Sequence, residues 1–465
     1  MNICRSVSRC CRDGHSSHKK DSKWAWMVCL AASTNMAFTA GLLFCFGVLL
    51  PVFMDYFNES RERTAWVGSL SFAFGLVVAP LGASLINRFG CRAVSMAGCL
   101  ACASGLAVAS FASSLTLLFV SYAVFGCGSG CVLVSSVVVV RRCFDKRQSL
   151  ALGVSAAGQG LGTMVLSQVL QSLVTVVHWR DTLRIFAAAL FLNSFCGILY
   201  DANLTQGQVS SSTDEEEEKH RENSKRFTLH CSVWKVPGFL LLTACSFFVM
   251  FARITNYVHL VKFAQDLGTS FSAASRLVLY LGITAVVGRF AGGFLCSIKQ
   301  LKNLYILQGA GLINGISMML LTLAQSYSPL VAYAFTFGFC DGVTATVMNI
   351  EAVTCVDHYR AASSFGHFLL TISVTTLVGP PISGLIADSF GSYKPAFLMS
   401  GAFFIMGSLI PLVICVKRWN KRNMRDSLVD ESEAGKILEQ PGTPTESAHE
   451  RRNSDINVHD CVSSV

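Results

Sequence analysis

Charged residues are scarce in this sequence. Lys, Arg, Asp and Glu together make up 14% of its 465 residues, whereas soluble globular proteins carry about 25%. A soluble chain of this length would need several separate cores built from amphipathic elements, yet 52% of the residues here are hydrophobic. The composition therefore excludes an ordinary soluble protein and favours one that is embedded in a lipid bilayer.

Catalytic and metal-binding motifs are also missing. The sequence has no HExxH pattern, no GxSxG nucleophile elbow and no paired cysteines at the spacing of a zinc site. The glycines at 158–162 form no phosphate-binding loop, because no strand precedes them. Most of the 19 cysteines fall inside apolar runs, where free cysteine behaves as a small hydrophobic residue. We therefore predict neither an enzyme nor a metal or cofactor site.

Twelve apolar stretches are long enough to cross a bilayer, which takes about 20 helical residues. They lie at 24–50, 65–86, 93–112, 115–140, 148–175 and 183–200, and then at 237–260, 272–297, 303–324, 329–354, 363–387 and 395–416. We predict an all-α membrane protein with twelve transmembrane helices. The first stretch is long enough to stay as a span, so we expect no signal peptide.

Basic residues indicate how the chain is oriented, because cytoplasmic loops are enriched in Lys and Arg. The net charge is +9, and most basic residues flank the spans on one side. The other side has mainly Arg61, Arg63, Arg180, Lys262 and Lys394. We therefore place both termini in the cytoplasm, and we interpret the basic clusters as topology signals rather than as a nucleic-acid surface. Asn58 then lies outside, in the sequon Asn58-Glu59-Ser60, as a candidate for N-glycosylation.

Polar segments divide the chain. Residues 1–23, the linker at 201–236 and the tail at 417–465 are too polar to bury a core. We predict a cytoplasmic N-terminal segment, a six-helix bundle at 24–200, a cytoplasmic linker, a second six-helix bundle at 237–416 and a disordered cytoplasmic tail.

A faint repeat relates the two bundles. The stretch from Gly82 to Arg92 follows the second span, and Gly288 to Gly293 leads to Lys299 after the eighth. Each stretch is a glycine-rich helix end that runs into a short basic turn. Parallel repeats of this kind are typical of proteins in which two bundles rock around a central site.

Several motifs resemble the monocarboxylate transporter family of the major facilitator superfamily. The turn that contains Asn87, Arg88, Gly90 and Arg92 is similar to the superfamily's loop signature, although Asn87 stands where an Asp is usual. Residues 21–26, 143–158, 256–260, 365–381 and 391–393 are similar to motifs of the family itself. Together the motifs run in order from span 1 to span 12.

The resemblance carries several expectations. It implies the major facilitator fold with a conformational turn after span 2. It also implies transport of a monocarboxylate or a related small polar metabolite by alternating access, in the plasma membrane. Some relatives need a single-span glycoprotein partner, so the resemblance raises that expectation here too.

Two positions depart from the proton-coupled members of the family. Those members carry a lysine deep in span 1, where this chain has Phe44. They also carry an Asp one helical turn before an arginine of span 8, where this chain has Ala285 before Arg289. The chain therefore resembles the less characterised members. We expect facilitated transport, with proton symport through Asp341 or Glu351 as the alternative.

Charged residues inside spans are costly, so each is a candidate for function. Arg289 in span 8 is the first candidate, because a guanidinium can bind a carboxylate through two parallel hydrogen bonds. A helix-end anchor is the alternative. Arg253 lies about two turns before the predicted outer end of span 7. It is either a second anion contact or an arginine that extends toward the lipid surface.

Five further residues complete the candidate site. His259 contacts substrate or is an exposed histidine at the end of span 7. Asp341 and Glu351, both in span 10, pair with Arg289, carry a coupling proton or form an ion pair between the halves. Phe44 and Asn35 either line the cavity or simply pack.

Another class of function stays open at this point. A receptor or scaffold without transport activity would signal through the linker and tail, although neither shows a recognisable domain. A channel would need a re-entrant filter or a ring of charges, and neither is visible. The sequence favours transport.

Overall fold

The computed structural model describes residues 21–145, 147–200, 234–298, 303–354 and 361–410, and every regular element within these ranges is helical. The helices are α2 (Lys23–Phe44), α3 (Phe46–Phe57), α4 (Arg61–Ala109), α5 (Leu115–Cys143), α6 (Gln148–Asn193), the 3-10 helix η1 (Ser194–Leu199), α9 (Pro237–Asp266), α10 (Phe271–Ser297), α11 (Asn303–Leu321), α12 (Tyr327–Thr354) and α13 (Ala361–Phe390). A last helix covers Lys394–Ile410.

Two of the described helices, α4 and α6, are each long enough for two membrane spans and change direction at a single residue. Helix α4 turns at Gly90 (φ 84°, ψ 161°), and α6 turns at His178 (φ 63°, ψ 165°). The Gly90 conformation is essentially confined to glycine. When α2 and α3 are counted as one crossing, interrupted at Cys45, the described helices are consistent with the twelve predicted spans.

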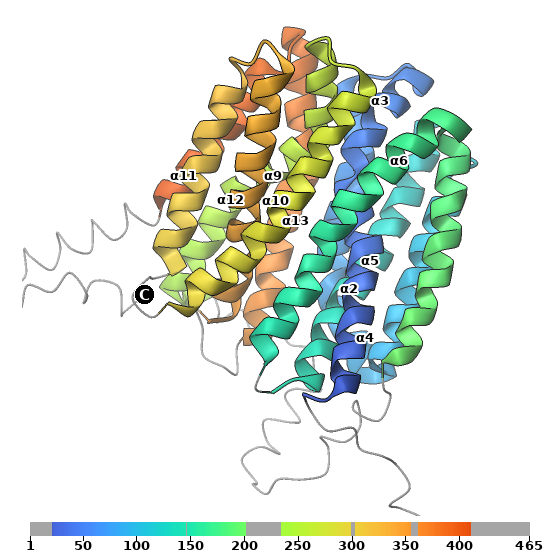
Figure 1. Ribbon diagram of the computed structural model, residues 1–465, viewed down its shortest axis with the longest axis vertical. Helices are drawn as coiled ribbons and strands as arrows, with labels where there is room; N and C mark the ends of the chain where they lie inside the picture. The colour runs from blue at the N-terminus through green and yellow to red at the C-terminus, as the bar shows by residue number, and fades with distance from the viewer. Residues whose placement is uncertain (1–20, 146, 201–233, 299–302, 355–360, 411–465) are drawn as a thin grey trace, which may run out of the picture.

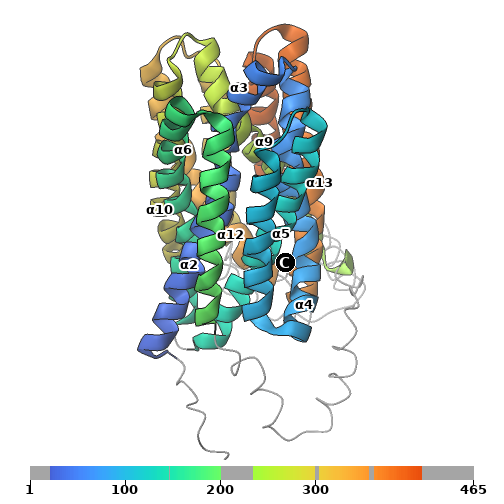
Figure 2. The ribbon, with the colours of Figure 1, turned by 90° about the vertical axis from the view of Figure 1, so that its right-hand side faces the viewer.

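The helices form two groups that lie side by side (Figure 1), and the view of Figure 2 has the first group in front of the second. Helices α2 to α6 and η1 make the first half, and α9 to α13 with the last helix make the second. The halves meet where α4 packs on α13, α6 on α10 and α3 on α9. Side chains that face this seam are the ones that meet between the two halves.

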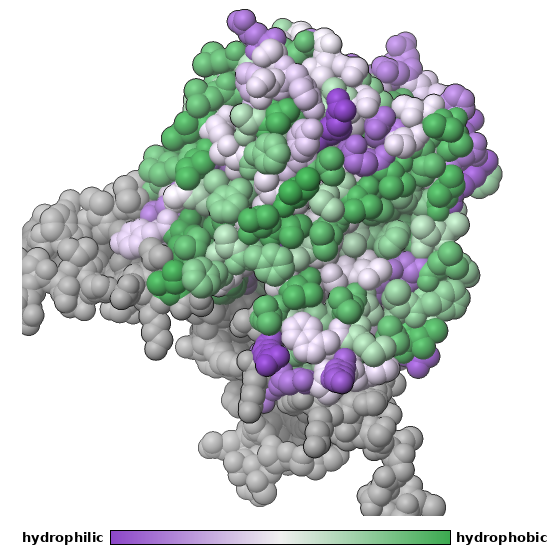
Figure 3. All heavy atoms as spheres, viewed as in Figure 1, coloured by the Kyte–Doolittle hydropathy of each residue, from purple (hydrophilic) through white to green (hydrophobic). Residues whose placement is uncertain are grey.

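Hydrophobic residues cover much of the face of the bundle that Figure 3 shows. Val176, Leu323 and Phe294 have exposed fractions of 77%, 72% and 70%. Monomeric soluble proteins rarely expose contiguous apolar patches larger than a few hundred Å². Among the described helices, nine are long and apolar enough to cross a bilayer. The outer surface is therefore suited to lipid rather than to water.

Small residues let the helices of the first half approach closely. A Cβ built on Gly41 of α2 would lie 2.8 Å from the backbone of Gly162 in α6, so neither position accepts a larger side chain without movement. Close backbone approach matters in lipid because the hydrophobic effect drives little association between helices there. This contact fixes α2 against α6 and so positions Phe44, the last residue of α2.

Some helix bounds differ from the predicted ones. The sequence predicts that span 7 ends at residue 260, but α9 continues to Asp266. Arg253 therefore lies near the middle of the helix rather than two turns from its end. The predicted loop at 176–182 is helical except at His178. Most of the predicted N-terminal segment and linker, and the whole tail, lie outside the described residues.

Candidate functional site

Arg289 lies on α10 at the seam between the halves, with 6% of its surface exposed. Its Nη1 donates a hydrogen bond to the carbonyl oxygen of Ala156 in α6, at 2.8 Å. Among the described residues, no carboxylate forms an ion pair with Arg289. A guanidinium offers five N–H donors, and this contact uses one of them. Burial at the seam contradicts the alternative of a helix-end anchor.

Arg253 and Asp341 form a buried ion pair within the second half. The Nε and Nη2 of Arg253 donate to the two oxygens of Asp341 in α12, and the Nη2–Oδ2 distance is 3.1 Å. The hydroxyl of Tyr257, one turn further along α9, donates to Asp341 Oδ2 at 3.0 Å. Asp341 has no exposed surface. This bidentate geometry is the one in which a guanidinium binds a carboxylate most strongly.

Phe44, from the first half, packs beside the ion pair of Arg253 and Asp341. Its ring stands edge-on to Tyr257, with 4.6 Å between the ring centroids. The Cζ of Arg253 lies 5.4 Å from the centroid of Phe44, within the range of a cation–π contact. Arg289 lies next to this group, because a Cβ built on Gly342, the residue after Asp341, would lie 2.8 Å from the backbone nitrogen of Arg289. We call these five residues, Phe44, Arg253, Tyr257, Arg289 and Asp341, the central cluster.

The structure decides between several alternatives for the charged residues. Arg253 is 7% exposed and points at Asp341, so the expectation that it extends toward lipid is wrong. Asp341 pairs with Arg253 in its own half. Within the described ranges it forms no ion pair with Arg289 or with any residue of the other half. Glu351 Oε2 accepts a hydrogen bond from Asn303 Nδ2 at 3.0 Å. It links α12 to the start of α11 and does not contact Arg289.

His259 is completely buried, so the expectation of an exposed histidine at the end of a span is wrong. Its Nε2 lies 2.8 Å from the carbonyl oxygen of Pro380, and its Nδ1 lies 3.2 Å from the hydroxyl of Tyr393. The imidazole therefore joins α9 to α13 and to the turn that follows α13. None of these contacts involves the central cluster.

Asn35 belongs to a polar network inside the first half. Its Nδ2 donates to the Tyr200 hydroxyl at 2.9 Å, and its Oδ1 accepts from Asn193 Nδ2 at 2.8 Å. These contacts join α2, α6 and the end of η1. Of the two residues expected to line a cavity or to pack, Phe44 lies at the seam and Asn35 packs within one half.

The turn at Gly90 has the position that the loop signature predicts. Asn87, Arg88 and Arg92 flank it with exposed side chains, and the Arg88 guanidinium lies 5.3 Å from the Phe89 ring centroid. A role in conformational change stays a prediction.

Two of the motif segments meet in space. The carboxylate of Asp21 accepts hydrogen bonds from the backbone N–H groups of Asp145 and Arg147, each at 3.3 Å. These groups lie in the turn between α5 and α6. Asp21 thus joins the start of α2 to the start of α6, the helix whose Ala156 carbonyl contacts Arg289.

A contact between the halves that the sequence did not reveal surrounds Arg61. Its Nη2 donates to Asp266 Oδ2 at 2.8 Å, and its Nη1 donates to the Ala387 carbonyl at 3.0 Å. Asp388 Oδ2 accepts from the backbone N–H of Glu62 at 3.0 Å, at the first turn of α4. We call Arg61, Asp266, Ala387 and Asp388 the Arg61 clasp. It closes the end of the seam at which α3 ends.

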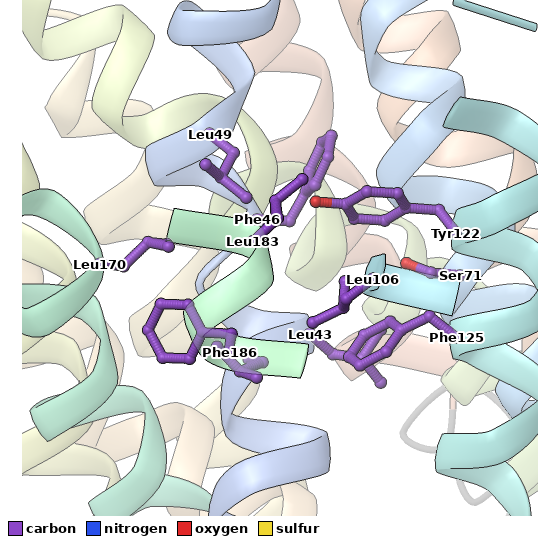
Figure 4. Close-up of a pocket in the computed structure, with 11 residues that line it drawn as sticks. Leu43, Phe46, Leu49, Ser71, Leu106, Tyr122, Phe125, Leu170, Leu183 and Phe186 are labelled. Carbon is purple, nitrogen blue, oxygen red and sulfur yellow. The ribbon is translucent and has the colours of Figure 1, made fainter. Parts of the chain in front are cut away.

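A separate small cavity lies within the first half (Figure 4). Leucine and phenylalanine side chains make up most of its lining, and the only polar lining residues are Ser71 and Tyr122. No charged group lines it, so it offers an anion no compensation for lost water. This cavity is therefore distinct in chemistry from the central cluster.

Comparison with known proteins agrees with the motifs and the fold. Residues 30–366 match the family described as Major Facilitator Superfamily. Monocarboxylate transporter 13 of Rattus norvegicus is 30% identical over 85% of this chain and 90% of its own length. Monocarboxylate transporter 12 of Rattus norvegicus is 28% identical over 90% of this chain and 91% of its own length.

Solved structures show the same fold. One is a bacterial homologue of the human lysosomal transporter Spinster, in an inward-facing and unoccupied conformation. It aligns with a TM-score of 0.68 at 16% identity, over 84% of this chain and 98% of its own. A POT family transporter in complex with 5-aminolevulinic acid aligns with a TM-score of 0.67 at 14% identity, over 86% and 97% of the two chains. The fold, the matched family and the two relatives together show that the chain belongs to the monocarboxylate transporter family of the major facilitator superfamily and is a multi-pass membrane transporter.

Proposed function

We propose that this transporter carries a small monocarboxylate, or a related polar metabolite with a carboxylate group, by alternating access. The observation that supports the proposal most directly is Arg289, a buried arginine at the seam without a carboxylate partner among the described residues. A cation in a membrane-spanning helix is costly unless it is compensated. An anionic solute would supply the missing charge.

The charges of the central cluster favour a solute with one negative charge. Arg253 is already neutralised by Asp341, and Arg289 adds one positive charge. A carboxylate can accept two parallel hydrogen bonds from a guanidinium. The Ala156 carbonyl is a neutral acceptor on the other half, so a carboxylate can replace it at Arg289 without separating an ion pair.

We propose facilitated transport rather than proton symport. Proton coupling through Asp341 would require the aspartate to bind a proton while Arg253 and Tyr257 donate three hydrogen bonds to it. Those bonds stabilise the ionised carboxylate. Measurement of cytosolic pH during uptake tests this choice, and acidification in step with uptake would contradict it.

The proposed setting is the plasma membrane, with both termini and the linker in the cytoplasm. Asn58 lies on the exposed turn between α3 and α4, at the end closed by the Arg61 clasp, which would then face outward. A glycosidase-sensitive shift in gel mobility that Asn58→Gln abolishes would support this orientation. Co-purification from a plasma membrane tests the expected single-span glycoprotein partner.

Uptake by cells that express the chain tests the proposed substrate. Radiolabelled pyruvate, lactate and 3-hydroxybutyrate are the probes, and lactamide is the uncharged counterpart of lactate. We expect uptake of at least one carboxylate above that of cells without the chain, with lactamide excluded. Arg289→Ala should lower kcat/KM by about tenfold or more, since a hydrogen bond to a charged group contributes roughly 1.5–3 kcal/mol.

Arg276→Ala is the matched control, because Arg276 lies on the same helix and is exposed. It should transport as the parent does when uptake is normalised to the amount at the cell surface. Normal uptake by Arg289→Ala, or no uptake of any of the three carboxylates by the parent, would contradict the proposal.

A further inference from the structure

The central cluster contains two arginines and one aspartate, so its net charge is +1 when all three are ionised. Asp341 pairs with Arg253, and Gly342, the next residue of α12, packs against the backbone of Arg289. Among the described residues, Asp341 accepts hydrogen bonds from Arg253 and Tyr257 alone. The choice of partner decides the chemistry of the site, because Asp341 would neutralise Arg289 if it paired with that residue instead.

We propose that Arg253 is a positioning residue that sets the charge selectivity of the site by holding Asp341 away from Arg289. This inference rests on the proposed function, since it assumes that Arg289 receives the carboxylate. Arg253 itself does not contact the solute. It determines whether Arg289 has a free positive charge to offer.

Three contacts make Arg253 the stronger partner of Asp341. The pair is bidentate, which fixes the orientation of the carboxylate as well as its distance. Tyr257 donates a third hydrogen bond from the same helix as Arg253. The ring of Phe44, from the first half, makes a cation–π contact with the guanidinium of Arg253, which helps to hold it beside Asp341. All three contacts favour Arg253 over Arg289.

Removal of Arg253 alone should therefore block Arg289. In Arg253→Gln, Asp341 is left as a buried carboxylate without a cation, and such a group takes an available partner because burial of an unpaired charge is costly. Arg289 is then the one cation left in the cluster. We expect the KM for the transported carboxylate to rise by about tenfold or more, although Arg289 itself is unchanged.

Removal of both charges should reverse the effect. Arg253→Gln combined with Asp341→Asn leaves Arg289 as the single charge, so the net charge of the cluster is again +1. We expect this double variant to transport the carboxylate with a KM within about threefold of the parent. A merely structural role of the ion pair predicts the opposite, because the double variant has lost the pair entirely.

Asp341→Asn alone gives a third and independent readout. This variant keeps both arginines, so the cluster has a net charge of +2 and favours a dianion. We expect succinate to inhibit uptake of the monocarboxylate about tenfold more strongly than it does in the parent. Glu351→Gln is the matched control on the same helix, since Glu351 bonds to Asn303 outside the cluster. It should leave the inhibition by succinate unchanged.

The experiment measures KM and succinate inhibition for these variants and for Arg289→Ala, with whichever of pyruvate, lactate or 3-hydroxybutyrate the parent transports fastest. Normal uptake by Arg289→Ala contradicts the proposed function. Loss in Arg289→Ala together with parental KM in Arg253→Gln contradicts only the role of Arg253. If Arg253→Gln does not reach the cell surface, the double variant and Asp341→Asn still test the proposal. Loss of uptake in the double variant at normal surface level, or unchanged succinate inhibition in Asp341→Asn, would overturn the proposal.

Discussion

Tyr122 ends in a buried hydroxyl that has no hydrogen-bond partner among the described residues. In Figure 4 the hydroxyl points into the cavity of the first half. Tyr200 is equally buried, but its hydroxyl bonds to Asn35 at 2.9 Å and to Ser136 at 3.4 Å. The two tyrosines thus differ in what a missing hydroxyl would change.

We predict that Tyr122→Phe does not lower the thermal stability of the purified transporter, because an unsatisfied buried hydroxyl contributes no net stabilisation. Tyr200→Phe should lower the stability by about 1 kcal/mol, since it leaves the amide of Asn35 without its closest acceptor. The midpoint of thermal unfolding in detergent measures both effects. Equal losses in the two variants would mean that Tyr122 has a partner, such as a water molecule, in the folded protein.

A single residue could be assigned from the sequence only where a charge inside a span, or a departure from the family pattern, marked it. Arg289 and Phe44 stood out because of an uncompensated charge in a span and a departure from the family pattern, and both lie at the seam. The partner of Arg253 could not be predicted. Asp341 lies 88 residues later in the chain, and its pairing depends on how α9 and α12 are rotated against each other. The burial of His259 was missed because α9 continues beyond the apolar run that marks span 7.

At the scale of elements, the ends of α4, α9 and α13 meet in the Arg61 clasp. The carboxylate of Asp388 caps the first turn of α4, where free backbone N–H groups favour an anion. Arg61 in turn reaches Asp266, the last residue of α9. Three helix ends from two halves are therefore joined through one arginine and two carboxylates.

We predict that Arg61→Gln opens this end of the seam. Spin labels at the exposed positions Asn58 and Lys394 report the separation of the halves there, by double electron–electron resonance. The variant should show a longer mean distance than the parent. Arg63→Gln is the control, because the ion pair of Arg63 with Glu59 lies within its own segment. An unchanged distance in Arg61→Gln would mean that apolar packing alone holds this end closed.

The bounds of most helices could be predicted to within a few residues, because the length of an apolar run sets the span. The conformation of the connections between consecutive helices could not be predicted as well. The apolar runs break at 176–182, but the structure replaces the predicted loop with a single residue at positive φ, His178. Gly90 is different, because its place in the loop signature and its lack of a Cβ both indicate a turn.

At the scale of the whole molecule, two bundles enclose a seam whose charged groups face each other rather than lipid. The composition, the apolar runs and the repeat were sufficient to predict this architecture. The side chains that meet across the seam were not predictable, because they depend on how the two bundles are docked. Arg289 illustrates both cases. Its charge within a span is evident from the sequence, whereas its contact with Ala156 of the other half is evident only from the structure.

The reactivity of a cysteine in place of Arg289 tests the central claim most directly. A water-soluble, charged methanethiosulfonate reagent modifies thiols that are in contact with water, and Val287, two residues away on α10, is 55% exposed on the apolar surface. We predict that Arg289→Cys is labelled faster than the parent chain and that the transported carboxylate slows its labelling, whereas Val287→Cys stays at the parent rate. Labelling of Val287→Cys without labelling of Arg289→Cys would place Arg289 away from the solute path and contradict the account.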